Sequence, residues 1–291
     1  MKLFVETKLT VPGVYPHMTL SATADPATTA YEAFAPFYDA YTHSYDHHRW
    51  LGNLEAIAFE AGLQGHRLLD VACGTGKSFM PMLERGYEVT ACDISPGMVE
   101  RARQRSGLEP TDVFVADMRD LPRLGEFDLA TCLDDSLNYL LYEGELERAL
   151  AGVARNVRPG GFFIFDLNSL AVYETLFSQK AIVATDEAMF CWRGSGEPEV
   201  EPGATCEATI EIFSENDGEC WTPTSSRHLQ RHHDLALIRE LLPVAGFELV
   251  ELYGQVTGAK LEQPVDEHRH LKLVYFCRRA HTGPAPATEG G

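Results

Sequence analysis

The sequence from Arg67 to Gly76 is Arg-Leu-Leu-Asp-Val-Ala-Cys-Gly-Thr-Gly. Its mostly apolar part, Leu68 to Val71, is typical of a strand buried in a parallel sheet. Gly74 and Gly76 then allow positive φ angles and leave no Cβ between the main chain and a ligand. The stretch therefore predicts a strand, a tight turn and a helix, with a nucleotide-like ligand held against the turn.

Three kinds of glycine-rich loop compete for this turn, and spacing separates them. A phosphate-binding P-loop requires a glycine five residues before its final Gly-Lys-Ser, but Val71 occupies that position before Gly76. A dinucleotide-binding loop requires a third glycine for close packing of the helix, and that position holds Phe79. The spacing disfavours an NTPase and gives a nicotinamide-binding protein little support.

Acidic residues follow the next predicted strands. The segment Glu88 to Asp93 is a second apolar strand that ends in a carboxylate, 19 residues beyond Gly74, where doubly wound folds place the residue that binds ribose hydroxyls. A third short strand precedes Asp117. Because parallel strands end at one edge of a sheet, Asp70, Asp93 and Asp117 are expected to face one crevice. Each acid alone would also suit a strand-end cap or a helix start.

Taken in order, these segments resemble the motifs of the class I S-adenosylmethionine-dependent methyltransferases. The matching segments are Asp-Val-Ala-Cys-Gly-Thr-Gly (70–76), Glu-Val-Thr-Ala-Cys-Asp (88–93), Ala-Asp-Met-Arg (116–119) and Arg-Pro-Gly-Gly (158–161). The resemblance covers residues from about 66 to 170. It implies an α/β fold with a doubly wound, Rossmann-like, seven-stranded sheet. It also implies S-adenosyl-L-methionine as cofactor and S-adenosyl-L-homocysteine as product. No metal is expected, since the paired acids Asp134 and Asp135 permit a magnesium site but no third ligand is visible.

The same resemblance implies a set of cofactor-binding residues. Asp93 would bind the ribose, Asp117 would accept a hydrogen bond from the adenine amino group, and Met118 would lie beside the ring. Cys73 is expected to pack or to contribute backbone rather than to act as a nucleophile. The whole expected set is Tyr38, Asp70, Ala72, Cys73, Gly74, Gly76, Asp93, Ile94, Met98, Asp117, Met118 and Leu133.

The acceptor side is expected in the octad from Cys132 to Tyr139, which leaves the fourth predicted strand at the crevice. Asp135 is the candidate that attracts a protonated amine or removes its proton, and Tyr139 is the candidate that hydrogen-bonds the nucleophile. Asn138 is the third catalytic candidate. The alternative is a helix start in which Asp134 or Asp135 is only an N-cap.

The segment from Tyr31 to Ala61 is aromatic and helical, and it lies where small-molecule methyltransferases place a lid over the cofactor. Tyr38 is the first expected contact, followed by Tyr45 or Trp50, unless these rings simply pack the helix onto the sheet. The run Asp46-His47-His48 is not expected to bind a metal, because adjacent helical histidines point about 100° apart.

A second, antiparallel sheet is expected between the fifth and sixth core strands. Residues 204–213 alternate, Asn216-Asp217-Gly218 is a hairpin signal, and residues 224–233 form the return strand. This layout resembles the aminosugar N,N-dimethyltransferases of antibiotic pathways, in which the inserted sheet covers the substrate and can pair subunits. His228, Arg231, His232 and His233 are candidate contacts, although histidines on such a strand are more often at the surface.

Composition and charge limit the class of substrate. The 291-residue chain has a net charge of −19 and no large basic cluster, so nucleic acid is not an expected partner. Arg227, Arg231 and Arg239 form either a local basic pocket or a solvated face. The sequence contains no apolar run of the ~18 residues that a membrane span needs. No signal peptide is evident, and the seven cysteines are scattered, so a cytoplasmic location away from the membrane is expected.

These observations predict a methyltransferase that acts on a small molecule by direct in-line displacement, on an amine nitrogen of secondary metabolism. The alternatives are a small-molecule O-methyltransferase, a non-methylating S-adenosylmethionine-binding protein and an NAD-dependent oxidoreductase. A homodimer fits the resemblance. The expected division of the chain is an extended or disordered segment (1–27, with Met18 as an alternative start), a helical lid (28–65), the cofactor-binding core (66–179), the inserted sheet (180–233), the end of the core (234–280) and a disordered tail (281–291).

Overall fold

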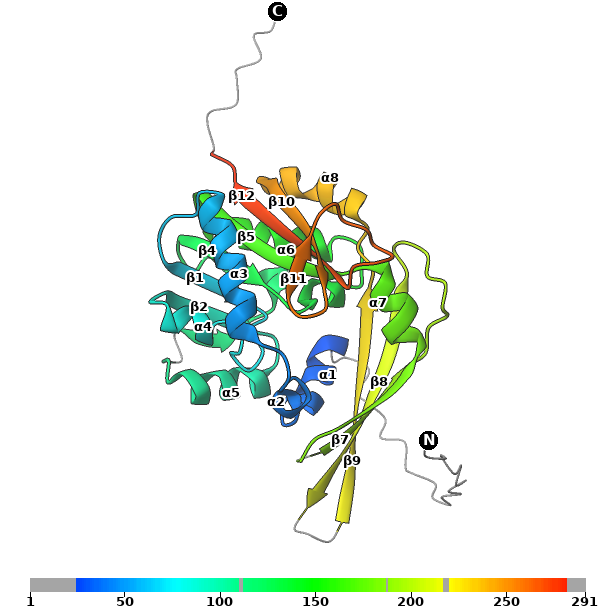
Figure 1. Ribbon diagram of the computed structural model, residues 1–291. Helices are drawn as coiled ribbons and strands as arrows, with labels where there is room; N and C mark the ends of the chain where they lie inside the picture. The colour runs from blue at the N-terminus through cyan, green and yellow to red at the C-terminus, as the bar shows by residue number, and fades with distance from the viewer. Residues whose placement is uncertain (1–24, 110–111, 187, 217–219, 282–291) are drawn as a thin grey trace, which may run out of the picture.

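The computed structural model describes residues 25–109, 112–186, 188–216 and 220–281 (Figure 1). It shows a sheet with helices on both sides, two short helices near the N-terminus, and a long antiparallel sheet that projects from the core (Figure 1). The predictions for residues 1–24, for the hairpin tip at 217–219 and for the tail from 282 onward lie outside the described residues.

The core sheet has eight strands in the order β11-β10-β12-β5-β4-β1-β2-β3. The first five strands in sequence pair in parallel, and β12 lies antiparallel between β5 and β10. The predicted doubly wound sheet is confirmed, with one strand more than expected. The extra strand, β11, has only three residues, too few for a periodic pattern. The strands are β1 (Arg67–Val71), β2 (Glu88–Asp93), β3 (Val113–Val115), β4 (Phe127–Cys132), β5 (Val157–Asn168), β10 (Phe247–Val256), β11 (Lys260–Glu262) and β12 (Lys272–Arg279).

Helices cover both faces of this sheet. One apolar cluster joins strand residues such as Leu68 and Phe162 to α3 (His47–Glu60), α4 (Met80–Glu84) and α5 (Pro96–Ser106). A second cluster joins Leu69 and Phe163 to α6 (Glu145–Ala154) and α8 (Leu235–Ala245). Because both faces are buried, the carboxyl ends of the parallel strands are the edge where a ligand site can form.

Polar side chains and a glycine set several helix ends. The Ser95 hydroxyl caps α5 by accepting a hydrogen bond from the Met98 N–H at 3.1 Å. Asp234 caps α8 in the same way, through the Ala236 N–H at 2.7 Å. Gly246 ends that helix at a φ of 84°. These ends orient the strands that follow them.

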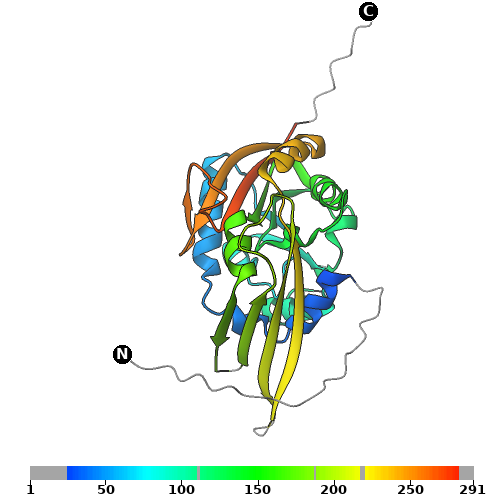
Figure 2. The same ribbon diagram turned by 90° about the vertical axis from the view of Figure 1, so that its right-hand side faces the viewer.

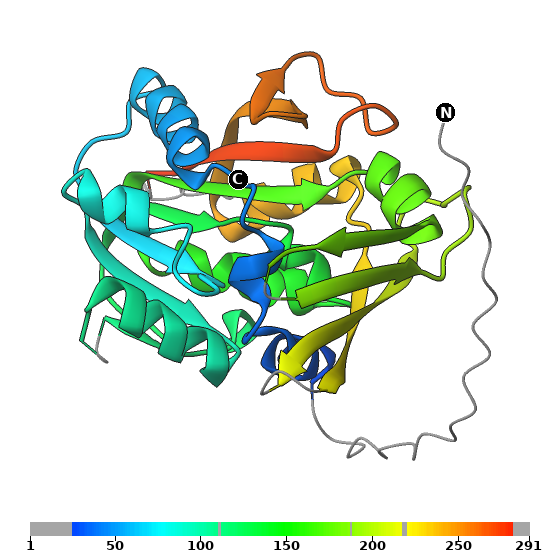
Figure 3. The same cartoon turned by 60° about the horizontal axis from the view of Figure 1, so that its bottom comes forward.

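The N-terminal aromatic segment forms three helices, α1 (Pro26–Phe34), α2 (Tyr38–Tyr41) and α3. Pro36 interrupts the pattern between the first two, since proline lacks the N–H that a continuous helix needs. Asp46 then caps α3 by accepting from the Arg49 N–H at 3.0 Å. Figure 3 shows α1 and α2 between the core sheet and the second sheet.

The second sheet has four antiparallel strands in the order β6-β7-β8-β9, reached from β5 through α7 (Leu170–Thr175). Figure 2 shows β8 and β9 extending well below the core. The inner face, with Phe190 and Ile210, packs against Phe34 of α1 and Phe177. The predicted inserted sheet is confirmed, with two strands more than the hairpin signal indicated. Its strands are β6 (Lys180–Ala184), β7 (Ala188–Gly194), β8 (Thr205–Asn216) and β9 (Cys220–Arg231). The described residues also form the 3-10 helices η1 (Met118–Asp120), η2 (Ser136–Tyr139) and η3 (Leu176–Ser178).

Within the described part of the chain, every helix is too short or too polar to cross a bilayer.

Candidate functional site

The turn after β1 is built on left-handed backbone. Ala72, Gly74 and Gly76 have φ angles of 59°, 55° and 86°. A Cβ on Gly74 would point toward Tyr38 of α2, 3.9 Å from its Cε1 atom, so the missing side chain leaves open space between the turn and α2. A Cβ on Gly76 would come within 2.9 Å of the Phe79 ring. Gly74 therefore forms a cradle for a ligand, whereas Gly76 allows the turn to pack against the helix that follows.

The acids at the ends of β1 and β2 have different surroundings. Asp70 is fully buried and accepts hydrogen bonds from Thr131 at 2.7 Å and from Ser78, so it ties the turn to β4 and is not in the wall of the space beside the turn. Asp93 lines the space beside the turn and accepts from the Gly74 N–H at 2.8 Å and the Ser95 N–H at 2.9 Å. Burial raises the pKa of Asp93 to about 6. Asp93 is thus the carboxylate that a ligand would meet.

Two small hollows, of about 60 and 30 Å³, lie at the carboxyl ends of β1 to β4, and we call them together the strand-end pocket. Most of the residues expected to bind the cofactor line it. Asp70, Gly76 and Met98 do not, and Met98 is buried in the core, so these three support the pocket from behind. The lining members of the expected set are Tyr38, Ala72, Cys73, Gly74, Asp93, Ile94, Asp117, Met118 and Leu133.

Asp117 is held in place by Arg119. The guanidinium contacts the Asp117 carboxylate through Nη2 at 2.6 Å and also binds Glu145 at 2.9 Å and Asp25 at 2.7 Å. Burial alone would raise the pKa of Asp117, but Arg119 holds it below its usual value. Since Asp25 is the N-cap of α1, the same arginine attaches that helix to the rim of the strand-end pocket.

A larger cavity of about 610 Å³ lies between the core, α1, α2 and the inserted sheet. The cavity and the strand-end pocket share Tyr31, Tyr38, His47, Asp134 and Tyr139 in their walls, so the two spaces meet at these residues. The wall of the cavity is largely aromatic, formed by Tyr31, Phe34, Tyr38, Tyr41, Tyr45, Tyr139, Phe177 and Trp192.

Asp134 and Asp135, at the end of β4, both adopt left-handed backbone, with φ angles of 57° and 55°. Such conformations are costly for non-glycine residues and cluster at functional sites. The Asp166 carboxylate stabilises them by accepting the N–H of Asp134 at 3.0 Å and of Asp135 at 2.6 Å. The Asp135 side chain makes no capping hydrogen bond to η2, which argues against the N-cap alternative.

One lysine neutralises part of this acidic group. Nζ of Lys272, on β12, lies 2.8 Å from Asp135, 3.2 Å from Asp166 and 3.7 Å from Asp134. Asp135 also accepts a hydrogen bond from Gln230 at 2.6 Å, so both of its oxygens have partners. Three carboxylates around one ammonium leave a net negative charge at the cavity wall.

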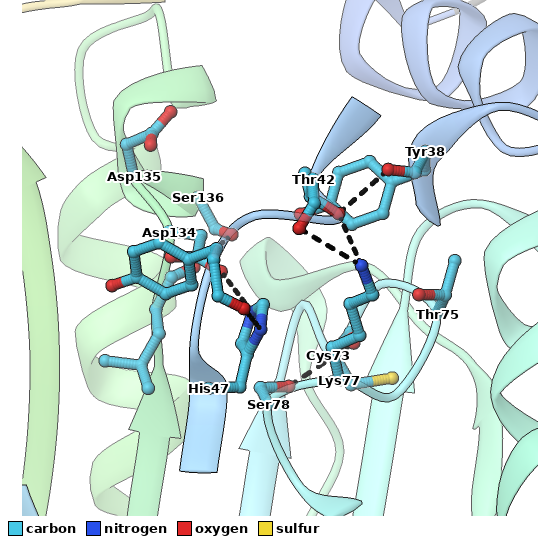
Figure 4. Close-up of polar contacts among 12 residues, drawn as sticks. Tyr38, Thr42, His47, Cys73, Thr75, Lys77, Ser78, Asp134, Asp135 and Ser136 are labelled. Atoms are coloured by element: carbon cyan, nitrogen blue, oxygen red, sulfur yellow. Dashed lines mark hydrogen bonds and ion pairs between the residues drawn. The ribbon is translucent and has the colours of Figure 1, made fainter. Parts of the chain in front are cut away.

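Asp134 is the carboxylate at the junction of the two spaces. Figure 4 shows it facing His47, whose Nε2 is 3.5 Å from Oδ2, while Asp135 points away. Burial alone would raise the pKa of Asp134, but Lys272 and His47 hold it below its usual value. The structure therefore brings Asp134, rather than the predicted Asp135, beside the strand-end pocket.

Of the other two catalytic candidates, Tyr139 lies in the cavity wall and Asn138 does not. Tyr139 lines both spaces, and its hydroxyl lies 2.8 Å from Nδ1 of His228. Asn138 is fully buried; it donates to the Arg231 carbonyl at 2.8 Å and accepts from the Asn168 N–H at 2.9 Å. It thus joins β5 to β9, and we correct its predicted role from acceptor contact to structural link.

Several predictions about side chains near the cavity change. Of the histidines that were candidate contacts, His228 lines the cavity, whereas His232 and His233 do not. All three are buried rather than at the surface, at 3%, 1% and 4% exposed. Trp50 is fully buried in the core, as the packing alternative held, whereas Tyr45 lines the cavity.

None of Arg227, Arg231 and Arg239 lines the cavity described here. Arg239 is exposed, whereas Arg231 is half-buried and donates to the Leu141 carbonyl at 3.2 Å. Arg227 instead binds Glu207 at 2.6 Å on an exposed face of the inserted sheet.

Sequence reasoning missed His47, Asp166 and Lys272. Asp166 was detectable in principle, because it is the one charge in the apolar run from Phe162 to Leu167, and a buried charge requires a partner. Lys272 begins a strand that ends in Arg278 and Arg279, so its charge alone did not mark it. His47 carried no such signal. It faces Asp134 while His48 faces Glu84, so the two histidines do not share a ligand direction. Among the described residues, no group of three His, Cys, Asp or Glu side chains is arranged to hold a metal.

Comparisons with known proteins identify the family to which this chain belongs. A model of the methyltransferase domain matches residues 68–161. The YqeM protein of Bacillus subtilis (strain 168), a methyltransferase by its name, is 30% identical over 234 residues, which are 79% of this chain and 91% of that protein. The dTDP-3-amino-3,6-dideoxy-alpha-D-glucopyranose N,N-dimethyltransferase of Streptomyces fradiae is 32% identical over 149 residues, 50% of this chain and 57% of that enzyme.

The fold comparison agrees. A crystal structure of an S-adenosylmethionine-dependent methyltransferase from Clostridium acetobutylicum ATCC 824 superposes with a TM-score of 0.71 at 24% identity, covering 86% of this chain and 99% of that one. Together with the strand-end pocket, these matches set aside the nicotinamide alternative. The chain belongs to the class I S-adenosylmethionine-dependent methyltransferases.

Proposed function

We propose that this enzyme methylates an amine nitrogen of a small molecule held in the large cavity. The observation that carries the proposal is the junction at which the strand-end pocket meets an aromatic, net negative cavity. The amino-sugar dimethyltransferase activity named for the Streptomyces fradiae relative supports an amine acceptor.

The cofactor would lie in the strand-end pocket. Asp93 would accept from the ribose hydroxyls, Gly74 would let the ligand approach the backbone, and Asp117 and Met118 would lie beside the adenine. Bound S-adenosylmethionine supplies an electrophilic methyl group; the new C–N bond forms as the C–S bond breaks, and sulfur keeps that electron pair. The protein's part is mainly to align acceptor and donor and to exclude water.

We propose that α1 and α2 act as the lid. The hollows of the strand-end pocket are far smaller than the ~300 Å³ at the low end for ligand sites, so we expect these helices to move outward when the cofactor enters. Two ties would then hold α1 closed: Asp25 to Arg119 at 2.7 Å and Glu32 to the Gly97 N–H at 2.8 Å. Both ties are polar and partly exposed, which suits a contact that opens and closes.

Charge favours a nitrogen acceptor over an oxygen acceptor. Asp134, Asp135 and Asp166 outnumber Lys272, and this net negative charge attracts an ammonium group and stabilises the positive charge that develops on an attacking amine. The Tyr31 and Tyr139 rings at the junction add cation–π attraction. Lys272 is the one Lys or Arg in the described cavity wall, and it is already neutralised. We therefore do not extend the proposal to a nucleotide-diphosphate sugar.

The direct test is release of S-adenosylhomocysteine from S-adenosylmethionine with paired amines and alcohols of the same carbon skeleton. Suitable pairs are 2-phenylethylamine with 2-phenylethanol and glucosamine with glucose. We expect turnover with an amine and not with its alcohol partner. Methylation of the alcohols alone would establish an O-methyltransferase, and cofactor binding without any turnover would favour the non-methylating class.

Asp134→Asn tests the carboxylate at the junction. We expect the KM for the amine to rise about tenfold, because an interaction with a charged partner is lost, while the affinity for S-adenosylhomocysteine stays within threefold. Steady-state kinetics and titration calorimetry measure the two quantities. Asp120→Asn, on an exposed side chain, is the control. An unchanged KM would remove Asp134 from the acceptor site.

The pKa of Asp93 gives a pH dependence of cofactor binding. The carboxylate is protonated below about pH 6 and then no longer accepts two hydroxyl hydrogen bonds. The Kd for S-adenosylhomocysteine is therefore expected to be flat above about pH 6.5 and to rise toward tenfold per pH unit as the pH falls below the pKa. Calorimetry from pH 5 to 8 measures this, and Asp93→Asn should bind weakly with a flat profile. A flat profile in the wild type would contradict the assignment.

A further inference from the structure

A chain of hydrogen bonds runs from the cavity into the lid. The Tyr139 hydroxyl lies 2.8 Å from Nδ1 of His228, and Nε2 of the same imidazole lies 2.8 Å from the Ser226 hydroxyl. That hydroxyl in turn lies 2.8 Å from the carbonyl oxygen of Ala30 in α1. Four groups on η2, β9 and α1 are thus joined in one line.

The far end of this line sets the direction of every proton in it. The Ala30 carbonyl can only accept, so Ser226 donates to it and must accept from Nε2–H of His228. The opposite arrangement would place the oxygens of Ser226 and Ala30 at 2.8 Å with no proton between them. Burial lowers the pKa of His228 to about 4, so the imidazole is neutral near pH 7 and carries a single proton. Nδ1 is therefore bare and accepts the proton of Tyr139.

Packing holds the imidazole in this orientation. Its ring stacks on Trp192 with centroids 6.4 Å apart, and the rings of Tyr31 and Phe34 meet it edge to face at 5.7 and 5.6 Å. His228 is 3% exposed, so rotation of the ring requires movement of these neighbours. The hydroxyl proton of Tyr139 thus points inward toward His228. Its oxygen faces two donors of the cavity wall, the Tyr31 hydroxyl and the Gln230 amide, and an amine N–H would donate to it in the place of one of them.

We infer that Tyr139 is a hydrogen-bond acceptor for the amine, with His228 as its positioning residue, and that methylation consequently stops at the tertiary amine. This inference rests on the proposed amine methylation. A primary or secondary amine can donate an N–H to the Tyr139 oxygen while its lone pair attacks the methyl group. A tertiary amine with a free lone pair has no N–H to donate.

The hydrogen bond strengthens as the reaction proceeds. As the C–N bond forms and the C–S bond breaks, the nitrogen gains positive charge and keeps its proton, so its N–H becomes a charged donor. An interaction that is stronger in the transition state than in the ground state raises kcat. The methylated ammonium later gives this proton to solvent. Asp135 places further negative charge beside Tyr139, which suits the same charge development.

The first experiment does not depend on turnover. In protein labelled with ¹⁵N-histidine, the His228 signals are identified by their loss in His228→Gln. At pH 7.5 we expect a neutral imidazole with the proton on Nε2, and a shift of the Nδ1 signal in Tyr139→Phe but not in Tyr142→Phe, whose ring is exposed. A proton on Nδ1 would overturn the inference, because His228 would then donate to Tyr139 and the phenol proton would face the cavity.

The second experiment compares 2-phenylethylamine, its N-methyl and its N,N-dimethyl derivatives, or the same series of whichever panel amine is methylated. We expect turnover of the first two and at least about 100-fold slower formation of the quaternary product. Tyr139→Phe should lower kcat about 10- to 100-fold and reduce the discrimination against the tertiary amine. His228→Gln should act in the same direction, and the double variant should be no slower than Tyr139→Phe alone.

The outcomes separate the two proposals. Equal turnover of the tertiary amine overturns the role of Tyr139 while amine methylation stands. If no amine is methylated, the proposed function fails, and the role of Tyr139 toward an amine fails with it, although the proton position on His228 is still measured. Tyr142→Phe should match the wild type in both experiments.

Discussion

Asp93→Ala is expected to weaken the binding of S-adenosylhomocysteine by at least about 100-fold. The ionised carboxylate would lose two hydrogen bonds with ribose hydroxyls, each worth about 1.5–3 kcal/mol because one partner is charged. The variant also loses the acceptor of the Gly74 and Ser95 N–H groups, which loosens the turn that cradles the ligand. Titration calorimetry above pH 7, where Asp93 is ionised, measures the effect.

Asp70 provides the matched control for this variant. It is buried like Asp93, but its hydrogen bonds run to Ser78 and Thr131 within the protein, and it lines no part of the strand-end pocket. Asp70→Asn should therefore change the affinity much less than Asp93→Asn, although it should lower the melting temperature. Equal losses in the two variants, or an affinity for Asp93→Ala within threefold of the wild type, would refute the assignment of the ribose site.

The largest effect on stability is expected from Lys272→Met. The ammonium contacts three carboxylates, of which Asp166 is fully buried. Removing one partner from a buried ionic group leaves uncompensated charge, and we expect the free energy of unfolding to fall by about 3 kcal/mol. The melting temperature should fall by an amount on the order of 6–12 °C. Lys260→Met, on an exposed side chain, should leave both quantities nearly unchanged.

The loss of stability in Lys272→Met should grow as the pH rises. Burial already raises the pKa of Asp166 to about 6 with the lysine present, and removal of the lysine raises it further. A carboxyl group whose folded pKa exceeds its unfolded pKa makes the native state bind more protons, so stability falls as the pH rises. The variant should be closest to the wild type near pH 5 and furthest from it near pH 8. A deficit independent of pH in thermal unfolding would contradict the buried acidic group.

The sequence by itself predicted the parts of this protein that depend on local patterns. The apolar run of β1, the glycines after it and the acids at the ends of β2 and β3 follow from strand periodicity and turn chemistry over a few residues. The strands of the inserted sheet also show alternating apolar and polar residues in the sequence, because one face of that sheet is buried. The strand β11 shows no such pattern, because it has only three residues.

The local sequence does not distinguish some residues that have different roles in the folded protein. Asp70 and Asp93 both end a strand, and only the packing of Ser78 and Thr131 around Asp70 makes it a support while Asp93 faces the pocket. Asn138 and Tyr139 are adjacent, yet one joins two strands and the other lines the cavity. A distance of one or two residues along the chain does not decide which way a side chain points in an irregular turn.

Only the tertiary structure decided the chemistry of the acceptor site. Lys272 meets the carboxylates of β4 and β5 because β12 lies against β5, and His228 meets Tyr139 because the inserted sheet returns over η2. These partners come from segments 89 to 138 residues apart, as Tyr139 with His228 and Asp134 with Lys272 show. Hydrophobic period and turn propensity act over one element, whereas proton direction and net charge in a cavity are set by which elements pack together.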